Sequence, residues 1–466
     1  MSGTRGIVAA AGYVPYRRLQ RAEIAAFFGS GGGRGSRSVA SYDEDTTTMG
    51  VEAARLALRG TDVVPETLLF ATADPAYLEK TNATTVHAAL RLGTDVPGFD
   101  AGGAVRSGIG ALTFALRADH PVLVVSSDVR GGLPTSADEG GSGDAAAALL
   151  VGDGPGVVAE HIGGSSRTRE FIDRWRTPGD PRPRQWEERF GEVQYTALAD
   201  EAWNEALKRA DLEAEKVDVT ILTGTHPRAV KSISGKLGAT RIADDRTSVI
   251  GQTGTAHAAL LLTDAIEQAE PGQVIALVQL CDGVDVLLFR VTDAVKSWRP
   301  ARTIATQLEH TADLPYGKFL SWRDVVHLEP PRRPEPGRIS ASIAARTRDY
   351  KYAFVGSQDQ GSGDAHLPPQ RIDRNGDALD EMSPLPMSDV EGTISAFTID
   401  RIAYSPSPPI AFAVVDFDNG ARLPVELCDL DASKLAMGDR VEMTFRRLYT
   451  ADGIHNYFWK ARPLRG

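Results

Sequence analysis

The segment Phe99–Leu116 restricts the fold of this chain more than any other stretch. It begins as the end of a strand, passes through the turn Ala101–Ala104 with two adjacent glycines, and continues into a helix of small residues. Small side chains let two backbones approach closely, so we expect this helix to be buried. The start of a helix offers free N–H groups and a positive dipole end, which suits a thiolate nucleophile. Val105 stands where that nucleophile would be expected, between Ala104 and Arg106.

The first 295 residues alternate predicted strands and helices, which indicates parallel β-α units. Because 466 residues exceed one simple core, we expect two or three domains. The alternation starts again near residue 217, after a charged and aromatic insertion at 171–190. We therefore predict two similar α/β halves, at 1–165 and 166–295. Their expected strands and helices include 5–12, 68–72, 82–92, 121–127, 195–210, 217–223 and 274–280.

The pattern changes after residue 295. A proline-rich stretch, Glu329–Gly337, lies in a predicted connector that spans 296–345. From Gly392 onward the sequence is all-β, with short apolar or alternating runs and a strong hairpin signal at Asn419-Gly420. About five short strands in this region fit a small barrel such as an OB-fold, predicted over 392–466.

Composition excludes several classes of function. The net charge of −11 argues against nonspecific nucleic-acid binding, although arginines can still gather locally around an anionic ligand. No run of about 20 apolar residues predicts a membrane span, and the first residues lack a signal-peptide pattern. The two cysteines, Cys281 and Cys428, cannot form a disulfide framework, so we expect a cytoplasmic protein.

The order and spacing of several motifs along residues 1–295 resemble the thiolase superfamily, and most closely its branch of hydroxymethylglutaryl-CoA (HMG-CoA) synthase and ketoacyl-ACP synthase III. The resemblance implies a duplicated α-β-α-β-α body that takes acyl-CoA or acyl-carrier-protein thioesters as substrates and needs no bound cofactor. It also implies a homodimer, or a heterocomplex with a thiolase-type subunit, formed through a sheet edge near Pro121–Ser127. The matching motifs are Glu44-Asp45-Thr46, Phe99-Asp100, Gly143–Ala148, Gly152-Asp153-Gly154, His226 and Gly251–Ala256.

The C-terminal part resembles the OB-fold proteins that accompany thiolases and HMG-CoA synthases in complexes. Those proteins usually begin with a zinc ribbon, whose frame is matched here over 346–391 by Tyr352–Ser357 and Leu367–Ile372. The cysteines of the ribbon are absent, and residues such as Gln358, Gln360 and Asp373 stand where zinc ligands would be. Because four tetrahedral N or S ligands cannot be assembled here, we predict no structural zinc.

The resemblance also assigns catalytic positions. The family's acyl-accepting cysteine falls on Val105, its acid/base glutamate near Ala73, its histidine on His226 and its asparagine on Gln252. Valine has no nucleophilic atom, so we expect no acyl-cysteine chemistry. His226 follows a strand at a position where α/β sheets place ligands, and it could act as a base or donate to a thioester oxygen. Gln252 can still donate an N–H to that oxygen.

Other residues could replace the missing nucleophile or bind phosphate. A different register would bring Ser107 to the turn, although a helix cap is its expected role. Cys281 could be a relocated thiol, although a free cysteine more often behaves as a small buried hydrophobe. Arg176, Arg228 and Lys231 could contact the phosphates of CoA, because arginine suits phosphate recognition.

Two functions therefore compete. In the first, the chain makes or breaks C–C bonds of acyl thioesters by Claisen or aldol chemistry without a cysteine nucleophile, with His226 and Gln252 in the site. In the second, it is an inactive partner subunit that scaffolds an active thiolase-type enzyme or channels substrate to it. The loss of the cysteine, the glutamate and the zinc ligands favours the second, whereas the retained histidine favours the first.

Overall fold

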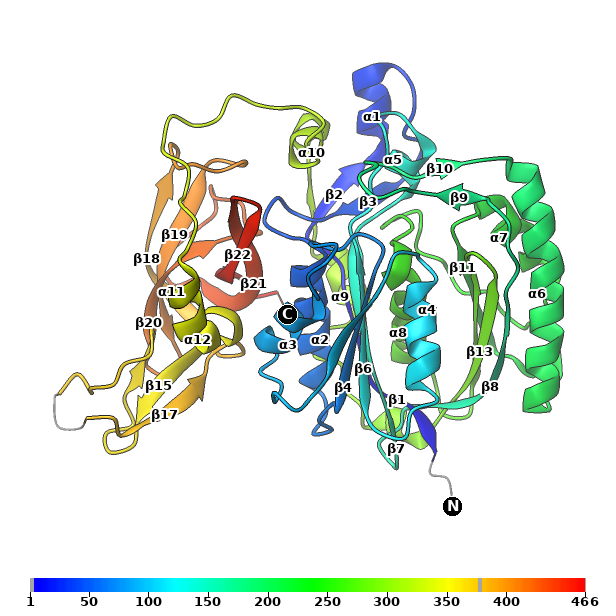
Figure 1. The fold of residues 1–466 in the computed structure, drawn as a ribbon, viewed down its shortest axis with the longest axis horizontal. Helices are drawn as coiled ribbons and strands as arrows, with labels where there is room; N and C mark the ends of the chain where they lie inside the picture. The colour runs from blue at the N-terminus through cyan, green and yellow to red at the C-terminus, as the bar shows by residue number, and fades with distance from the viewer. Residues whose placement is uncertain (1–3, 376–378, 466) are drawn as a thin grey trace. The chain divides into compact units, whose positions relative to one another are not determined.

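The computed structural model describes residues 4–375 and 379–465 and divides the chain into two compact units (Figure 1). The first unit comprises Met1–Ala40, Glu52–Ala83 and Thr94–Phe319. The second comprises Ser41–Val51, Thr84–Gly93 and Leu320–Gly466. No helix among the described residues is long and apolar enough to cross a membrane.

A nine-stranded sheet forms the centre of the first unit, in the order β11-β12-β13-β8-β1-β7-β6-β4-β5. The parallel pairs β11/β12 and β6/β4/β5 lie toward its two ends, and antiparallel strands join them in the middle. The strands are β11 (Val219–Gly224), β12 (Val274–Leu280), β13 (Val284–Val291), β8 (Ala159–Arg167), β1 (Arg5–Tyr13), β7 (Ala145–Asp153), β6 (Val122–Asp128), β4 (Thr67–Thr72) and β5 (Gly98–Gly102). This repeated arrangement confirms the predicted duplication of an α/β half.

Two helices of the first unit, α4 (Ser107–Ala115) and α8 (His257–Glu267), share its main apolar core with the central strands. The expected close approach of the small-residue helix is present, because a Cβ added at Gly108 would lie 2.5 Å from the carbonyl oxygen of Thr255. A second core lies under α6 (Glu188–Ala210) and α7 (Pro227–Ser234). Smaller elements of the unit are β2 (Arg17–Gln20), α1 (Arg21–Phe28), β3 (Ser36–Val39), α5 (Ala137–Gly141), β9 (Arg174–Trp175), β10 (Arg184–Gln185), α9 (Ile304–Glu309) and β14 (Ala312–Asp313).

Two expectations for the first unit are wrong. The segment near Pro121–Ser127 forms β6, which pairs with β4 and β7, so it is an interior strand; the edges are β5 and β11. Helix α6 begins at Glu188 rather than at Tyr195. Gly191 lies inside this helix, and a Cβ there would lie 2.7 Å from a carboxylate oxygen of Asp173, so glycine is the residue that leaves room for this carboxylate.

The second unit contains a closed five-stranded barrel in the order β18-β19-β20-β22-β21, with β20 and β22 parallel. This order is the OB-fold arrangement and confirms the expected barrel. Its strands are β18 (Gly392–Asp400), β19 (Ile410–Phe417), β20 (Arg422–Leu427), β21 (Arg440–Ala451) and β22 (Ile454–Pro463). The predicted hairpin turn joins β19 to β20, and Gly420 adopts φ 86°, which favours glycine.

The ribbon-like region forms a small sheet in the order β16-β15-β17, from Ala365–His366, Val355–Asp359 and Met382–Pro386. Helices α11 (Ala341–Arg346) and α12 (Arg348–Ala353) precede it. Asp373 pairs with His366, with 2.9 Å between Oδ1 and Nε2. Within residues 4–375 and 379–465, no group of three or more His, Cys, Asp or Glu side chains could hold a metal ion.

The acidic segment Asp43–Asp45 has two structural roles. Asp45 accepts a hydrogen bond from the N–H of Thr48 (2.9 Å) at the start of α2 (Thr46–Leu58), as expected for a helix cap. The same segment also contacts barrel cations within the second unit: the fully buried Lys460 lies 2.8 Å from Asp43, and the fully buried Arg446 pairs with Glu44. Buried charges need such partners, so the barrel depends on these carboxylates.

Candidate functional site

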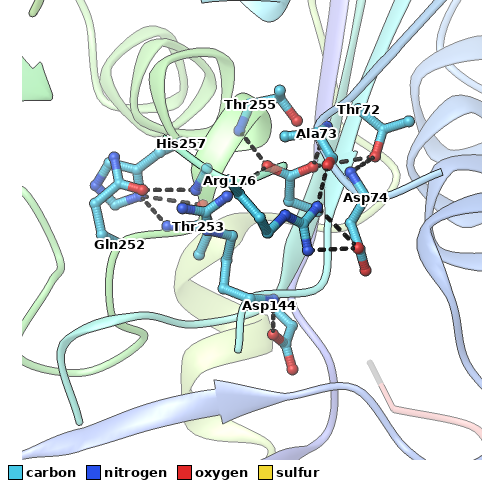
Figure 2. Close-up of polar contacts among 12 residues, drawn as sticks. Thr72, Ala73, Asp74, Asp144, Arg176, Gln252, Thr253, Thr255 and His257 are labelled. Atoms are coloured by element: carbon cyan, nitrogen blue, oxygen red, sulfur yellow. Dashed lines mark hydrogen bonds and ion pairs between the residues drawn. The ribbon is translucent and has the colours of Figure 1, made fainter. Parts of the chain in front are cut away.

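The carboxyl ends of β4 and β6 meet the short helix η2 (Gly254–Ala256) at the fully buried carboxylate of Asp128. This carboxylate accepts hydrogen bonds from the Thr72 hydroxyl (3.1 Å), the Ala73 N–H (2.8 Å) and the Thr255 N–H (2.9 Å), three groups that face one point in Figure 2. Burial raises the pKa of Asp128. These three hydrogen bonds hold the loop after β4, which carries the expected glutamate position near Ala73, against the segment after Gln252, the expected asparagine position.

The expected nucleophile position is buried and apolar. Val105 is only 9% exposed and lies two residues before the first residue of α4, Ser107. Arg106, beside it, forms a bidentate pair with Asp285, at 2.8 and 3.1 Å. The Ser107 hydroxyl donates to the Gly102 carbonyl (3.2 Å) and does not cap α4, so the expected cap is wrong. The start of α4 therefore presents no thiol, and the Ser107 hydroxyl there is hydrogen-bonded to a backbone carbonyl.

His226 follows β11 and caps the N-terminus of α7. Its Nδ1 accepts a hydrogen bond from the Ala229 N–H (3.1 Å), and its Nε2 donates to the Glu188 carbonyl (2.8 Å). The side chain is fully buried, and a carboxylate oxygen of Asp173 lies 3.9 Å from Nε2. Burial raises the pKa of Asp173. Both ring nitrogens are thus held by backbone groups, with the proton on Nε2.

Gln252 lines a cavity of about 400 Å³ in the first unit. Its side-chain carbonyl accepts from the Gly254 N–H (2.6 Å), which leaves the amide NH₂ as a donor (Figure 2). Lys231 and Arg21 bring positive charge to the same cavity, and Asp245 brings one carboxylate. His226 does not line this cavity, so the structure does not bring the two expected catalytic residues together there.

The other candidate residues lie apart from the cavity. Arg176 donates to the Ala73 carbonyl and to the Asp74 carboxylate (3.1 Å), so it covers the expected glutamate position (Figure 2). Arg228 pairs with Glu188 (3.0 Å) and Glu192 (3.3 Å) on the exposed side of α7. Of the three predicted phosphate-binding cations, only Lys231 lines the cavity.

Cys281 is sealed in the core. It is 1% exposed, and its sulfur accepts a hydrogen bond from the Gln279 side-chain amide (3.4 Å). Burial raises the pKa of the Cys281 thiol to about 11, so the thiol is protonated at neutral pH. This environment does not activate a nucleophile.

Sequence reasoning missed Asp128 and Asp173. Asp128 had a usable signal, because it is a carboxylate directly after the apolar run of β6, where parallel strands end. Asp173 had none: it lies in an irregular charged insertion, and only the fold places it beside His226.

Comparison with known proteins agrees with both units. Residues 386–446 match the family model of the ChsH2 C-terminal OB-fold domain. The HMG-CoA synthase of Methanopyrus kandleri is 29% identical over 340 residues, which cover 67% of this chain and 95% of that protein. The HMG-CoA synthase of Aeropyrum pernix is 28% identical over 331 residues, covering 67% and 92%.

Solved structures show the same fold for the first part of the chain. An HMG-CoA synthase complexed with CoA superposes with a TM-score of 0.56 and 19% identity, covering 68% of this chain and 89% of that one. The 3-oxoacyl-[acyl-carrier-protein] synthase III of Aquifex aeolicus gives a TM-score of 0.52 and 20% identity, covering 61% and 99%. At this identity, the likeness establishes the fold.

Proposed function

We propose that this chain, a thiolase-superfamily protein with a C-terminal OB-fold domain, binds acyl thioesters and acts on their C–C bonds without forming an acyl-cysteine. One observation carries the proposal: Val105 stands at the start of α4, where the fold would otherwise present a thiol to a positive helix end. Cys281 does not replace it, because its thiol is buried and protonated.

The cavity beside Gln252 supports thioester binding. Lys231 and Arg21 supply positive charge suited to the phosphates of CoA or of a carrier-protein pantetheine arm. The free NH₂ of Gln252 can donate to the thioester or keto oxygen and stabilise charge that develops there. The HMG-CoA synthases that resemble this chain support acyl-CoA as the substrate class.

An aldol-type step needs a base in addition to an oxyanion donor. His226 can supply that base only as the tautomer with its proton on Nδ1, which gives up the hydrogen bonds to the Ala229 N–H and the Glu188 carbonyl; in the described tautomer its Nε2–H is a donor to a substrate oxygen. The same contacts favour a second candidate function. In the described arrangement neither ring nitrogen is open, which suits an inactive subunit that scaffolds or channels substrate for an active thiolase-type enzyme.

Either function involves assembly with another subunit, as a homodimer or heterocomplex in the cytoplasm. The edge strand β5 supports this part of the proposal. Its outer side pairs with no strand of the described chain, Phe99 on it is 57% exposed, and Phe114 on α4 is 72% exposed. An apolar, unpaired edge is a surface that a partner strand can cover.

Calorimetric titration with acetyl-CoA tests thioester binding. Lys231→Gln and Arg228→Gln are matched variants, because both residues lie on α7 and only Lys231 lines the cavity. We expect Lys231→Gln to weaken binding about tenfold and Arg228→Gln to leave it unchanged, since one ionic phosphate contact contributes about 1–2 kcal/mol. Absence of binding to wild type would reject the proposal. C–C bond formation or cleavage by wild type, with an acyl-CoA donor and a carbonyl acceptor, would separate the enzyme from the inactive partner.

A further inference from the structure

The second unit has a groove of about 870 Å³ on the outer face of its barrel, which the proposed thioester site does not use. Its floor is formed by β19 and β20, and its ends by the loop after β18 and the β21/β22 hairpin. In OB-folds, the face of the second and third strands, with the loops that flank it, is the common ligand-binding face. The position of the groove therefore indicates a binding surface.

Aromatic rings line this groove, although strand positions that face outward are usually polar. Phe412 is 40% exposed and lies opposite Glu426 in the β19/β20 pairing. Tyr404, Tyr449 and Phe458 also line the groove and are only partly buried. Rings that remain partly exposed offer large apolar contact area at low entropic cost, so they suit recognition of a ligand.

The charges around the groove are mostly negative. Two lining residues are already paired: Glu426 contacts Lys460, and Arg447 contacts Asp45 at 3.7 Å. The charged residues that remain in the lining are Asp324 and Asp400, together with Arg333 and Glu335, which belong to the segment 329–337 along one wall. Outside that segment two carboxylates remain, which disfavour a phosphate backbone and favour a ligand that brings arginine side chains.

One wall of the groove is formed by a proline-rich segment that carries two arginines. We name Glu329–Gly337 the strap; it runs between α10 (Tyr316–Trp322) and α11 and contains four prolines, two arginines and two glutamates in nine residues (Figure 1). Arg333, Pro334 and Pro336 of the strap line the groove.

Two tyrosines at the groove bind the strap. The Tyr404 hydroxyl donates to the Glu335 carboxylate (2.8 Å), and the Tyr449 hydroxyl donates to the Gly337 carbonyl (3.3 Å). Aromatic grooves bind proline-rich segments in this way, because such segments are pre-ordered and leave their carbonyl groups free to accept hydrogen bonds.

We propose that this groove is a recognition site for proline-rich, arginine-bearing peptide segments, and that the strap is its resident ligand in the same chain. A segment of the same chemistry on another protein binds the groove when the strap detaches. Because the strap is tethered beside the groove, its effective concentration is on the order of millimolar, and it competes strongly with an external peptide.

The test uses the full-length protein and a fluorescent peptide with the sequence of residues 328–338. In one variant, residues 329–337 are replaced by a glycine-serine segment of equal length, which vacates the groove. Fluorescence anisotropy should show that this variant binds the peptide at least tenfold more tightly than wild type does. In the same background, Tyr404→Phe and Tyr449→Phe should each weaken binding about fivefold, whereas Tyr16→Phe, outside the groove, should leave it unchanged.

Three results would overturn the proposal. The first is no peptide binding by the strap-replaced variant, when its circular dichroism and thermal unfolding match wild type. The second is equal binding of a control peptide with its prolines changed to glycine, because attraction would then depend on charge alone. The third is tighter binding of a single-stranded oligothymidine, which would assign the groove to nucleic acid.

Discussion

Asp128→Asn tests whether one buried carboxylate holds the candidate site together. Asp128 accepts three hydrogen bonds, at 3.1, 2.8 and 2.9 Å, from Thr72, Ala73 and Thr255. An asparagine side chain can keep its carbonyl toward Thr72 and Ala73, but its NH₂ then faces the Thr255 N–H, a donor against a donor. A buried hydrogen bond to a charged group contributes about 1.5–3 kcal/mol, and the two retained bonds also weaken. We expect a loss of about 3 kcal/mol in unfolding free energy.

Thermal unfolding followed by circular dichroism measures this loss. For a unit of about 300 residues, about 1 kcal/mol lowers Tm by roughly 1.5–2 °C, so the transition of the first unit should fall by about 5 °C. Asp119→Asn is the matched control, because its side chain is fully exposed and its Tm should not change. Asp128→Ala would leave three donors without an acceptor and should prevent folding. A Tm for Asp128→Asn within about 1 °C of wild type would refute the assigned role of the carboxylate.

Three further predictions follow from buried groups. Burial raises the pKa of Glu267 from 4.5 to about 7, so the folded protein holds the Glu267 proton more tightly than the unfolded chain does. The unfolding free energy should therefore fall as pH rises from about 4.5 to 7. In urea unfolding, Glu267→Gln should make the unfolding free energy less dependent on pH over that range. Lys460→Met removes the buried cation that pairs with Asp43 and Glu426, so urea unfolding should show a barrel less stable by about 3–5 kcal/mol. Lys434→Met is the control, because this side chain is 83% exposed and its loss should not change the stability. Equal effects of the two variants would contradict the buried pairing. Val105→Cys should fold with about 1 kcal/mol less unfolding free energy than wild type. The introduced thiol should react with iodoacetamide faster than Cys281 does, because it lies at the start of a helix, whereas burial raises the pKa of Cys281. Equal reaction rates would argue against an activating environment at position 105.

The fold was largely predictable because its signals are local. The glycine-rich turn and small-residue helix at Phe99–Leu116 indicated close packing, and Gly108 against Thr255 shows why small residues are needed there. The short apolar or alternating runs after Gly392 and the Asn419-Gly420 turn indicated the barrel, and both agree with the structure.

The arrangement of the site was less predictable because it depends on contacts distant in sequence. His226 was identified correctly as following a strand, but the partner of its Nε2 is the Glu188 carbonyl, 38 residues away. Glu44-Asp45-Thr46 contributed only a motif of the family resemblance, since nothing local indicates that Arg446 and Lys460 need the carboxylates of Asp43–Asp45. Strand order could not be predicted from the sequence either, because an apolar run such as that of β6 looks the same whether the strand is central or at an edge of the sheet.

Intact-protein mass spectrometry after incubation with acetyl-CoA tests the central claim most directly. Wild type should bind acetyl-CoA and keep its unmodified mass, because Val105 has no nucleophilic atom and the Cys281 thiol is buried and protonated. Val105→Cys under the same conditions should gain one acetyl group, which would show that the surrounding site still presents a thioester to the start of α4. A stable acetyl adduct on wild type, whether on Cys281 or on another residue, would contradict the account.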